Sequence, residues 1–537
     1  MQVDRFVHDR LPPTDQWPVF LRQDTHATDA KPFNLVVALL EEAMHQPWAD
    51  QPLFRTVERN MTYREVLAQV NQRVHVLRQH YGLPTGQRVL IRGQNSIDSA
   101  LAWLAVVKAG LVAVMTMPLL RAKELGDIIA LSQPALALCE TSRLPDLLAA
   151  QSAHPVLKHV LSFGDPHAFE SLESVSQAWP ATSLDSQTTG EDVALLAFTS
   201  GTTGQPKAAC HAHRDVWLAC QAWPIHVLRA RTEDVVMGTP PLAFTFGLGG
   251  LLLFPMVAGA SVFFPEGPMA ADRMVEAMSL AGCTICYTAP TFYRQMTPLI
   301  AQHRVTSLRM CVSAGEALPE ATRQGWRNAT GLELLDGIGA TEMFHIFISS
   351  PTESMRSGSL GRVVPGYEAC VLDPSGQVLA PGHMGRLAVR GPTGCRYLQD
   401  KRQSSYVQHG WNITGDTVTQ DPDGYFFYHA RSDDMIVSAG YNIGGPEVED
   451  ALLTHPAVAE CAVIGKPDAS RGMVVKAFCV LRDGFEPNPE CIKALQDHVK
   501  QHLAPYKYPR EIVFVSSLPR TPTGKLQRFK LRDHHTP

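Results

Sequence analysis

Short apolar runs alternate with helical segments between Gly86 and Glu140, and this alternation limits the possible folds more than any other feature of the sequence. The expected strands are 88–91, 111–115 and 135–139, and the expected helices are 96–110 and 121–132. Strands separated by helices predict a parallel sheet. The same pattern resumes after Gly190, where strands are expected at 193–198, 260–264, 284–288 and 309–313.

The length of 537 residues is too great for one hydrophobic core, so two or more domains are expected. Frequent glycine and proline between short strands indicate a β-rich subdomain over 361–428. Residues 433–537 have the mixed helix and strand pattern of a compact α+β domain. We therefore predict a large α/β domain, 1–432, with parallel sheets flanked by helices, and a small α+β domain, 433–537.

Composition excludes several classes of protein. A net charge of −5 argues against a nucleic-acid-binding protein, because such domains carry a basic excess. The first twenty residues lack an apolar signal segment, and the apolar run 248–257 is too short to span a bilayer, so we expect a cytoplasmic protein with no membrane partner. Cys283 and Cys286 form a lone CxxC, which we interpret as part of a buried strand instead of a redox or zinc site.

A loop rich in glycine and threonine, Phe198-Thr-Ser-Gly-Thr-Thr-Gly-Gln-Pro-Lys207, follows the expected strand at 193–198. Glycines let backbone N–H groups approach phosphate oxygens, and hydroxyls add further donors. The candidate phosphate-binding residues are Thr199, Ser200, Gly201, Thr202, Thr203, Gly204 and Lys207. The spacing does not match the P-loop of kinases and ATPases. An ordinary polar turn would be the better interpretation if this loop stood alone.

Three further stretches favour nucleotide chemistry. In Asp336-Gly-Ile-Gly-Ala-Thr-Glu342, the carboxylate of Glu342 could bind Mg²⁺ while Thr341 contacts a phosphate. The segments 411–416 and 431–434 supply Asp416 and Arg431, which suit ribose hydroxyls and phosphate. Arg520-Thr-Pro-Thr-Gly-Lys525 places a lysine on an expected loop near the C-terminus.

Taken together and in this order, the four stretches resemble the adenylate-forming superfamily of acyl-CoA ligases, peptide-synthetase adenylation domains and firefly luciferase. The resemblance runs from about Phe33 to Arg532. It implies ATP, Mg²⁺ and coenzyme A as cofactors, and a small C-terminal domain that moves between two half-reactions. A non-catalytic nucleotide-binding relative is disfavoured, because both Glu342 and Lys525 are present.

The resemblance also assigns roles residue by residue. Thr199 to Lys207 would bind the β- and γ-phosphates, and Asp336 would lie near the exocyclic amine of adenine. The remaining implied roles are adenine flanking by Gly315, Glu316 and Ala317, α-phosphate contact by Thr341, Mg²⁺ binding by Glu342, ribose binding by Asp416 and Arg431, the hinge at Asp433, the pantetheine path at Gly440 and adenylation by Lys525. Gly440 could also be an ordinary turn glycine, and the two interpretations are not exclusive. The chain departs from the superfamily pattern at Asp336, often asparagine, and at Ile338, often aromatic.

Within the superfamily, the segment 335–347 and the segment 241–249 are most similar to benzoate–CoA ligases. The residues that would surround an aryl ring are Phe244, Thr245, Phe246, Gly247, Gly337, Ile338, Gly339 and His345. His345 could instead be a buried structural histidine. Residues 117–124 resemble 2-aminobenzoate ligases more than benzoate ligases, so we expect 2-aminobenzoate (anthranilate) as the acid. The alternatives are benzoate, or the loading of an aryl acid onto a carrier protein.

Overall fold

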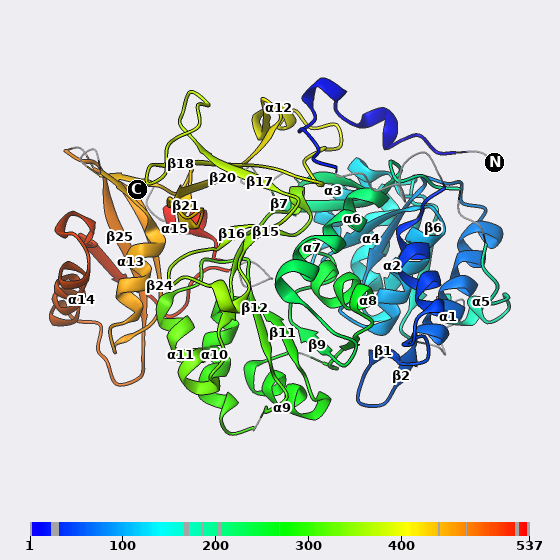
Figure 1. Ribbon diagram of the computed structural model, residues 1–537, viewed down its shortest axis with the longest axis horizontal. Coiled ribbons are helices and arrows are strands. Elements are labelled where there is room, and N and C mark those ends of the chain that lie inside the picture. Colours follow the sequence, from blue (N-terminus) through cyan, green and yellow to red (C-terminus); the bar gives the residue numbers. More distant parts are fainter. Residues whose placement is uncertain are drawn as a thin grey trace.

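The computed structural model describes residues 3–22, 32–165, 171–184, 187–200, 206–267, 269–303, 305–438, 441–468, 470–520 and 526–533. Figure 1 shows an elongated molecule with the N-terminal end of the chain at one side and the C-terminal end at the other. Over the described residues, none of the helices combines the length and the apolar character needed to cross a membrane.

The first sheet has six strands in the order β6-β5-β3-β4-β7-β8. Its strands are β3 (Arg88–Arg92), β4 (Val112–Thr116), β5 (Leu136–Glu140), β6 (His159–Phe163), β7 (Val193–Ser200) and β8 (Pro206–Ala212). The first five strands in this order are parallel, as predicted, and β8 pairs antiparallel with β7. The helices of this region are α1 (Tyr63–His75), α2 (Ile97–Lys108), α3 (Ala122–Ser132), α4 (Leu144–Ala153), α5 (Leu172–Ser176) and α6 (His213–Gln221).

The second sheet has seven strands in the order β13-β12-β11-β9-β10-β1-β2. Its strands are β1 (Pro52–Arg55), β2 (Asn60–Thr62), β9 (Val235–Gly238), β10 (Ser261–Phe263), β11 (Ile285–Thr288), β12 (Met310–Ser313) and β13 (Leu334–Leu335). Its helices are α7 (Thr245–Leu248), α8 (Phe254–Ala258), α9 (Ala271–Ala281), α10 (Pro290–Ile300) and α11 (Glu320–Thr330). Cys286 is buried in β11 as expected, whereas Cys283 is buried two residues before the strand begins.

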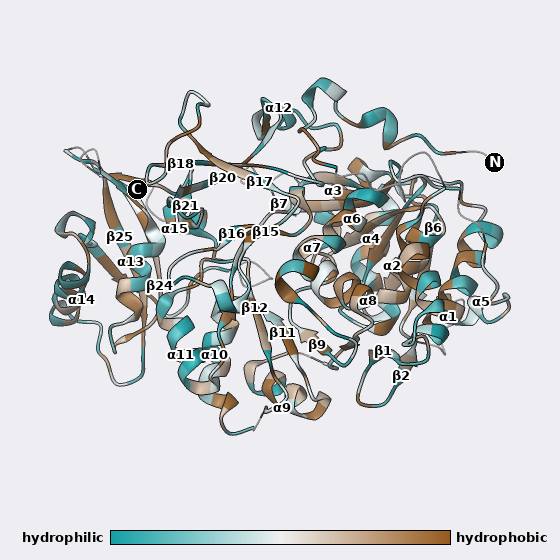
Figure 2. Ribbon diagram, viewed as in Figure 1, coloured by the Kyte–Doolittle hydropathy of each residue, from teal (hydrophilic) through white to brown (hydrophobic). Residues whose placement is uncertain are grey.

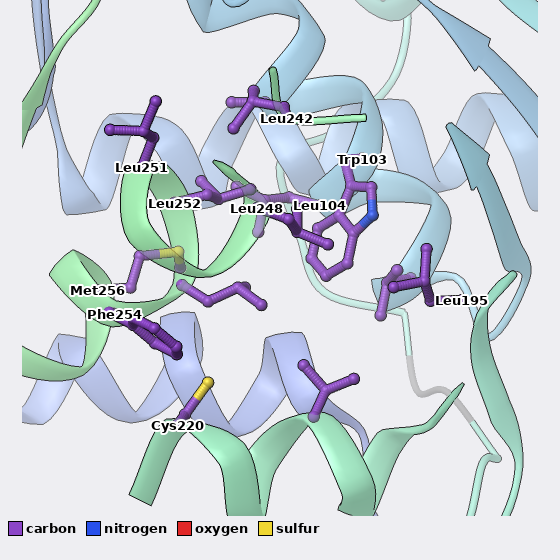
Figure 3. Close-up of a cluster of buried hydrophobic side chains, with 14 of the residues drawn as sticks. Trp103, Leu104, Leu195, Cys220, Leu242, Leu248, Leu251, Leu252, Phe254 and Met256 are labelled. Carbon is purple, nitrogen blue, oxygen red and sulfur yellow. The ribbon is translucent and has the colours of Figure 1, made fainter. Parts of the chain in front are cut away.

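Helix α2 joins the cores of the two sheets. Eleven of its twelve residues are buried, because the run from Ile97 to Lys108 is apolar on nearly every face. Figure 2 shows apolar residues along α2, whereas α14 (Pro489–His502) carries mostly hydrophilic residues. In Figure 3, Trp103 of α2 lies in one cluster with Leu195 of β7, Cys220 of α6 and Phe254 of α8. The two sheets therefore share one hydrophobic core.

Two antiparallel sheets form the β-rich part. One contains β14 (Gly337–Gly339), β15 (Ile346–Ser349) and β16 (Arg362–Val363). The other contains β17 (Glu368–Leu372), β18 (Met384–Arg390), β19 (Val407–Gln408), β20 (Trp411–Gln420) and β21 (Phe426–Arg431), next to the short helix α12 (Gln403–Tyr406). This confirms the predicted β-rich region and extends it towards the segment that carries Thr341 and Glu342.

The C-terminal part has its own sheet and its own core. It contains β22 (Ile436–Ser438), β23 (Tyr441–Ile443), β24 (Val458–Asp468), β25 (Gly472–Leu481) and β26 (Glu511–Phe514), with α13 (Gly445–Leu453), α14 and α15 (Arg528–Asp533). Its larger hydrophobic cluster draws only on residues between Ile436 and Phe514. The predicted fold class is confirmed, and the expected boundary at 432/433 falls in the turn between β21 and β22.

Candidate active site

The predicted phosphate loop begins where β7 and β8 pair. Thr199 is the register partner of Lys207 across this hairpin. The Thr199 hydroxyl is buried and has no hydrogen-bond partner among the described residues. Ser200 ends β7, and Gly201, Thr202, Thr203 and Gly204 lie outside the described residues, as do Gly440 and Lys525.

Lys207, Glu342 and Tyr397 form a compact cluster at this point. The Lys207 ammonium donates to Glu342 Oε1 at 3.0 Å, and the Tyr397 hydroxyl donates to the same oxygen. The ammonium also lies 4.5 Å from the centre of the Tyr397 ring and 5.5 Å from that of Tyr406. Burial alone would raise the pKa of Glu342, but the Lys207 charge and the Tyr397 hydroxyl outweigh it and hold that pKa below its usual range. The carboxylate is therefore ionised at neutral pH.

The Glu342 carboxylate in this cluster is a metal ligand of the kind that Mg²⁺ prefers. Magnesium prefers oxygen ligands and is commonly held by one or two carboxylates together with substrate phosphates. Glu342 supplies one ionised carboxylate, and the described residues contain no group of three or more His, Cys, Asp or Glu side chains that could hold a metal without a substrate. The residues present fit a metal that arrives with the nucleotide.

The turn that carries Thr341 is held by a histidine that the sequence did not reveal as part of the site. His211 Nε2 lies 2.8 Å from the carbonyl oxygen of Thr341. Burial lowers the pKa of His211 to about 4, so the ring is neutral and its Nε2–H donates a hydrogen bond to this carbonyl. Thr341 opens the 3₁₀ turn Thr341–Met343, and Phe344 leaves it with a φ of +69°. The strained exit and the His211 hydrogen bond together fix the orientation of Thr341 and Glu342.

Asp416 and Arg431 are brought together by the pairing of β20 and β21, in which they are register partners. Arg431 Nη1 donates to Asp416 Oδ1 at 3.2 Å and to the carbonyl of Thr414 at 2.8 Å. Burial raises the pKa of Asp416 despite this contact. Asp433 Oδ1 lies 3.9 Å from Arg431 Nε and is more than half exposed. The predicted ribose pair and the predicted hinge residue are therefore neighbours.

The predicted adenine residues lie after β12 and β13. Gly315 has a φ of +93°, which favours glycine, and Glu316 accepts a hydrogen bond from the Thr291 hydroxyl at 2.8 Å. Asp336 lies 3.7 Å from Arg323 Nη2, and burial raises the pKa of Asp336 to about 6. Asp336 is thus ionised at neutral pH and protonated in mild acid.

The predicted aryl site borders a cluster of rings. His345 lies 5.4 Å from Phe246, 4.5 Å from Phe254 and 5.3 Å from Trp223, measured between ring centres. Tyr287 lies 5.7 Å from Phe246. Phe246 and Ile338 are partly exposed, whereas His345 is buried. The cluster therefore has a buried floor and an accessible side.

Glycines keep the chain close to this cluster. A β-carbon at Gly249 would lie 2.7 Å from His345 Cδ2, and one at Gly339 would lie 2.7 Å from the His345 carbonyl oxygen. A β-carbon at Gly337 would lie 2.8 Å from Ile346 Cγ2, and one at Gly247 would lie 2.2 Å from the Pro241 carbonyl oxygen. Phe244 and Thr245 begin the turn of α7 beside Gly247.

Three polar atoms of the ring cluster are buried without a hydrogen-bond partner among the described residues: Trp223 Nε1, Tyr287 Oη and His345 Nδ1. Buried polar atoms without partners are uncommon in folded proteins and call for an explanation. Trp223 and Tyr287 were not predicted as site residues. The sequence offered no signal for them beyond being aromatic, because they lie more than fifty residues before His345.

Comparisons with known proteins place this arrangement in context. Residues 40–397 match the family profile of the AMP-binding enzyme, and residues 447–525 match that of the AMP-binding enzyme C-terminal domain. The benzoate–CoA ligase of Thauera aromatica is 35% identical over 477 residues, which cover 88% of this chain and 90% of the relative.

Two solved structures share the fold over nearly the whole chain. The anthranilate CoA ligase AuaEII, solved in complex with anthranoyl-AMP, has a TM-score of 0.89 and 37% sequence identity, covering 94% of this chain and 97% of that one. A benzoate CoA ligase from Burkholderia xenovorans LB400 has a TM-score of 0.85 and 30% identity, covering 93% and 100%.

Proposed function

The chain belongs to the AMP-binding enzyme family and is an AMP-forming acid–thiol ligase. We propose that it activates 2-aminobenzoate with ATP and transfers the acyl group to coenzyme A. The aromatic acid is supported by the ring cluster around His345 and by the similarity to benzoate and anthranilate CoA ligases. Flat rings bury their faces well against such a cluster, which supplies most of the binding energy of a small aryl ligand.

The unpartnered Nδ1 of His345 is the observation that carries the choice of 2-aminobenzoate. Burial lowers the pKa of His345 to about 3, so the ring is neutral. Its Nε2 lies 3.4 Å from the carbonyl oxygen of Phe246, which is an acceptor, so the proton resides on Nε2. Nδ1 is then a buried acceptor without a donor in the described part of the chain, and an amine N–H beside the substrate carboxylate is a donor of the right kind.

Lys207 and Glu342 would serve the first half-reaction, in which a carboxylate oxygen attacks the α-phosphate and pyrophosphate departs. Both reactants are anionic, so catalysis requires positive charge at the phosphates and accurate positioning. In this proposal Lys207 turns from Glu342 to the β- and γ-phosphates, Thr341 contacts the α-phosphate, and Asp416 with Arg431 holds the ribose. Mg²⁺ bound at Glu342 would supply further positive charge to the phosphates.

The predicted hinge residue and two residues outside the described part of the chain complete the proposal. Lys525 would contact both the substrate carboxylate and the α-phosphate during adenylation, and Asp433 would be the pivot on which the small domain turns for the second half-reaction. Gly440 would line the path of the pantetheine thiol. The thiol then attacks the acyl carbon, forms the thioester and releases AMP.

The proposal is tested by ATP–pyrophosphate exchange with a panel of acids: 2-aminobenzoate, benzoate, salicylate and decanoate. We expect exchange with the single-ring acids and background exchange with decanoate. Faster exchange with decanoate would contradict the aryl assignment. Thioester formation is then measured with coenzyme A and with a phosphopantetheinylated aryl carrier protein, and preference for the carrier would favour the loading enzyme instead.

A further inference from the structure

The small domain contacts the loop between β12 and α11, residues 314–319, and the start of the helix that follows it. It contains Gly315, Glu316 and Ala317, the predicted adenine-flanking residues. One contact lies at Glu316 within the loop, and the other lies at Glu320, where α11 begins. Figure 1 shows α13 and β24 beside α10 and α11, where these contacts occur.

The first contact is a chain of alternating charges across the two domains. Arg520 Nη1 lies 3.1 Å from Glu316 Oε1 in the large domain, and Arg520 Nη2 lies 2.8 Å from Glu460 Oε2 in the small domain. Glu460 in turn lies 3.8 Å from Arg294 of α10. A guanidinium can donate to two carboxylates at once, so Arg520 joins the loop to the body of the small domain.

The second contact completes a helix terminus. Helix α11 begins after Pro319, whose side chain cannot accept a hydrogen bond from the first backbone amides. Asp450 of α13, in the small domain, supplies this acceptor. Its Oδ1 accepts a hydrogen bond from the Glu320 amide at 2.8 Å. Burial at this contact raises the pKa of Asp450 to about 6, although the amide hydrogen bond opposes the shift. The small domain thus supplies the N-terminal cap of a large-domain helix.

The Arg520 contact borders a hollow part of the interface between the two domains. A cavity of about 370 Å³ lies between them, with Thr288, Phe292 and Glu316 on one side and Val480, Leu518 and Arg520 on the other. Beside this cavity, the two polar contacts tie the loop to the small domain. Loss of the Arg520 contact would leave Glu316 held by the Thr291 hydroxyl, and loss of the Asp450 contact would leave the Glu320 amide without its side-chain acceptor.

We propose that Asp450 and Arg520 are positioning residues of the nucleotide site, through which the docked small domain orders the loop 314–319 for adenine binding. The inference rests on the proposed function for the adenine role of the loop. It makes nucleotide affinity depend on the position of the small domain, without a direct contact between either residue and the nucleotide.

Asp450→Ala in the full-length enzyme is the first test, with Asp497→Ala as the matched control. Asp497 is a carboxylate on the surface of α14 in the same domain, paired with Lys500 of the same helix. We expect Asp450→Ala to increase hydrogen exchange in the peptide 314–322 and to weaken binding of α,β-methylene-ATP about fivefold, the factor obtained if the free energy of a typical helix cap is lost from binding. The control should leave both unchanged.

Arg520→Met is the second variant, since it acts on the other end of the loop and does not depend on α13 folding correctly. We expect faster exchange in 314–322 and a similar loss of analogue affinity. Unchanged exchange in both variants would overturn the inference, as would weaker binding without faster exchange. Binding is measured without acid or thiol, so an error in the proposed acid would not affect the result.

Discussion

Lys207 and Arg520 each hold a glutamate at about 3 Å, but their surroundings differ. Lys207 lies within the large domain against Tyr397 and Tyr406, and its partner Glu342 is 8% exposed. Arg520 joins two domains, is 23% exposed, and lies between two carboxylates. Loss of Glu342 would remove the carboxylate that is hydrogen-bonded to Lys207, whereas loss of Glu316 would leave Arg520 with Glu460. The comparison predicts a large effect at the buried pair and a moderate one at the interface.

Lys207→Met should have the largest effect, because it leaves an ionised Glu342 buried without a cation. Breaking a buried pair from one side costs about 3–5 kcal/mol, and losing a group that stabilises charge in the transition state costs roughly 10²–10³-fold in rate. Chemical denaturation and ATP–pyrophosphate exchange measure the two effects. The double variant Lys207→Met/Glu342→Gln should recover stability but not exchange. If the exchange rate of the Lys207→Met variant were within threefold of the wild-type rate, the predicted difference between the buried pair and the interface pair would be contradicted.

Tyr397→Phe tests how much of the buried pair depends on the hydroxyl that donates to Glu342. It keeps the ring beside Lys207 and removes two hydrogen bonds, one that the hydroxyl donates to Glu342 and one that it accepts from Lys207, so we expect about tenfold slower exchange and a loss of about 1–2 kcal/mol in stability. Tyr406→Phe is the matched control, because the Tyr406 hydroxyl is buried without a partner among the described residues. Equal losses in the two variants would show that exchange and stability do not depend on the hydrogen bond to Glu342 in particular.

Asp336 tests an intermediate case, since it is 10% exposed but its cation, Arg323, is farther away at 3.7 Å. Burial raises its pKa to about 6, so the carboxylate that would accept from adenine is present above pH 6 and lost below it. We expect the KM for ATP to rise severalfold as pH falls through 6. In Asp336→Asn, which keeps an acceptor that does not titrate, this rise should shrink. An identical pH profile in both proteins would exclude Asp336 as the titrating group.

The sequence was sufficient for most elements of the fold, because their signals are local. The strands at 88–91 and 284–288 were found within one residue of their ends, and α2 was recognised from its apolar run and the glycine after it. Strand β8 was missed, since it belongs to a hairpin whose turn had been interpreted only as a phosphate loop. Short strands such as β22 and β23 were missed because three residues give almost no periodic pattern.

Some residues of the candidate site could likewise be predicted from local motifs, and others could not. Glu342 and Lys207 were predicted because each belongs to a motif, although nothing in the sequence said that they would pair with each other. Tyr397 and His211 lie far along the chain from the segment 341–342. Tyr397 contacts Glu342 and His211 contacts the Thr341 carbonyl only because the sheets bring these segments together. Their roles depend on burial and hydrogen bonding across more than fifty residues, which no local pattern records.

The ratio of kcat/KM for 2-aminobenzoate to that for benzoate tests the central claim most directly. A neutral His345 with an unpartnered Nδ1 predicts a ratio of roughly tenfold to a hundredfold, because benzoate leaves that buried acceptor unsatisfied. His345→Leu removes the acceptor and should bring the ratio close to one while benzoate remains a substrate. Equal or better use of benzoate by the wild-type enzyme would contradict the assignment of 2-aminobenzoate.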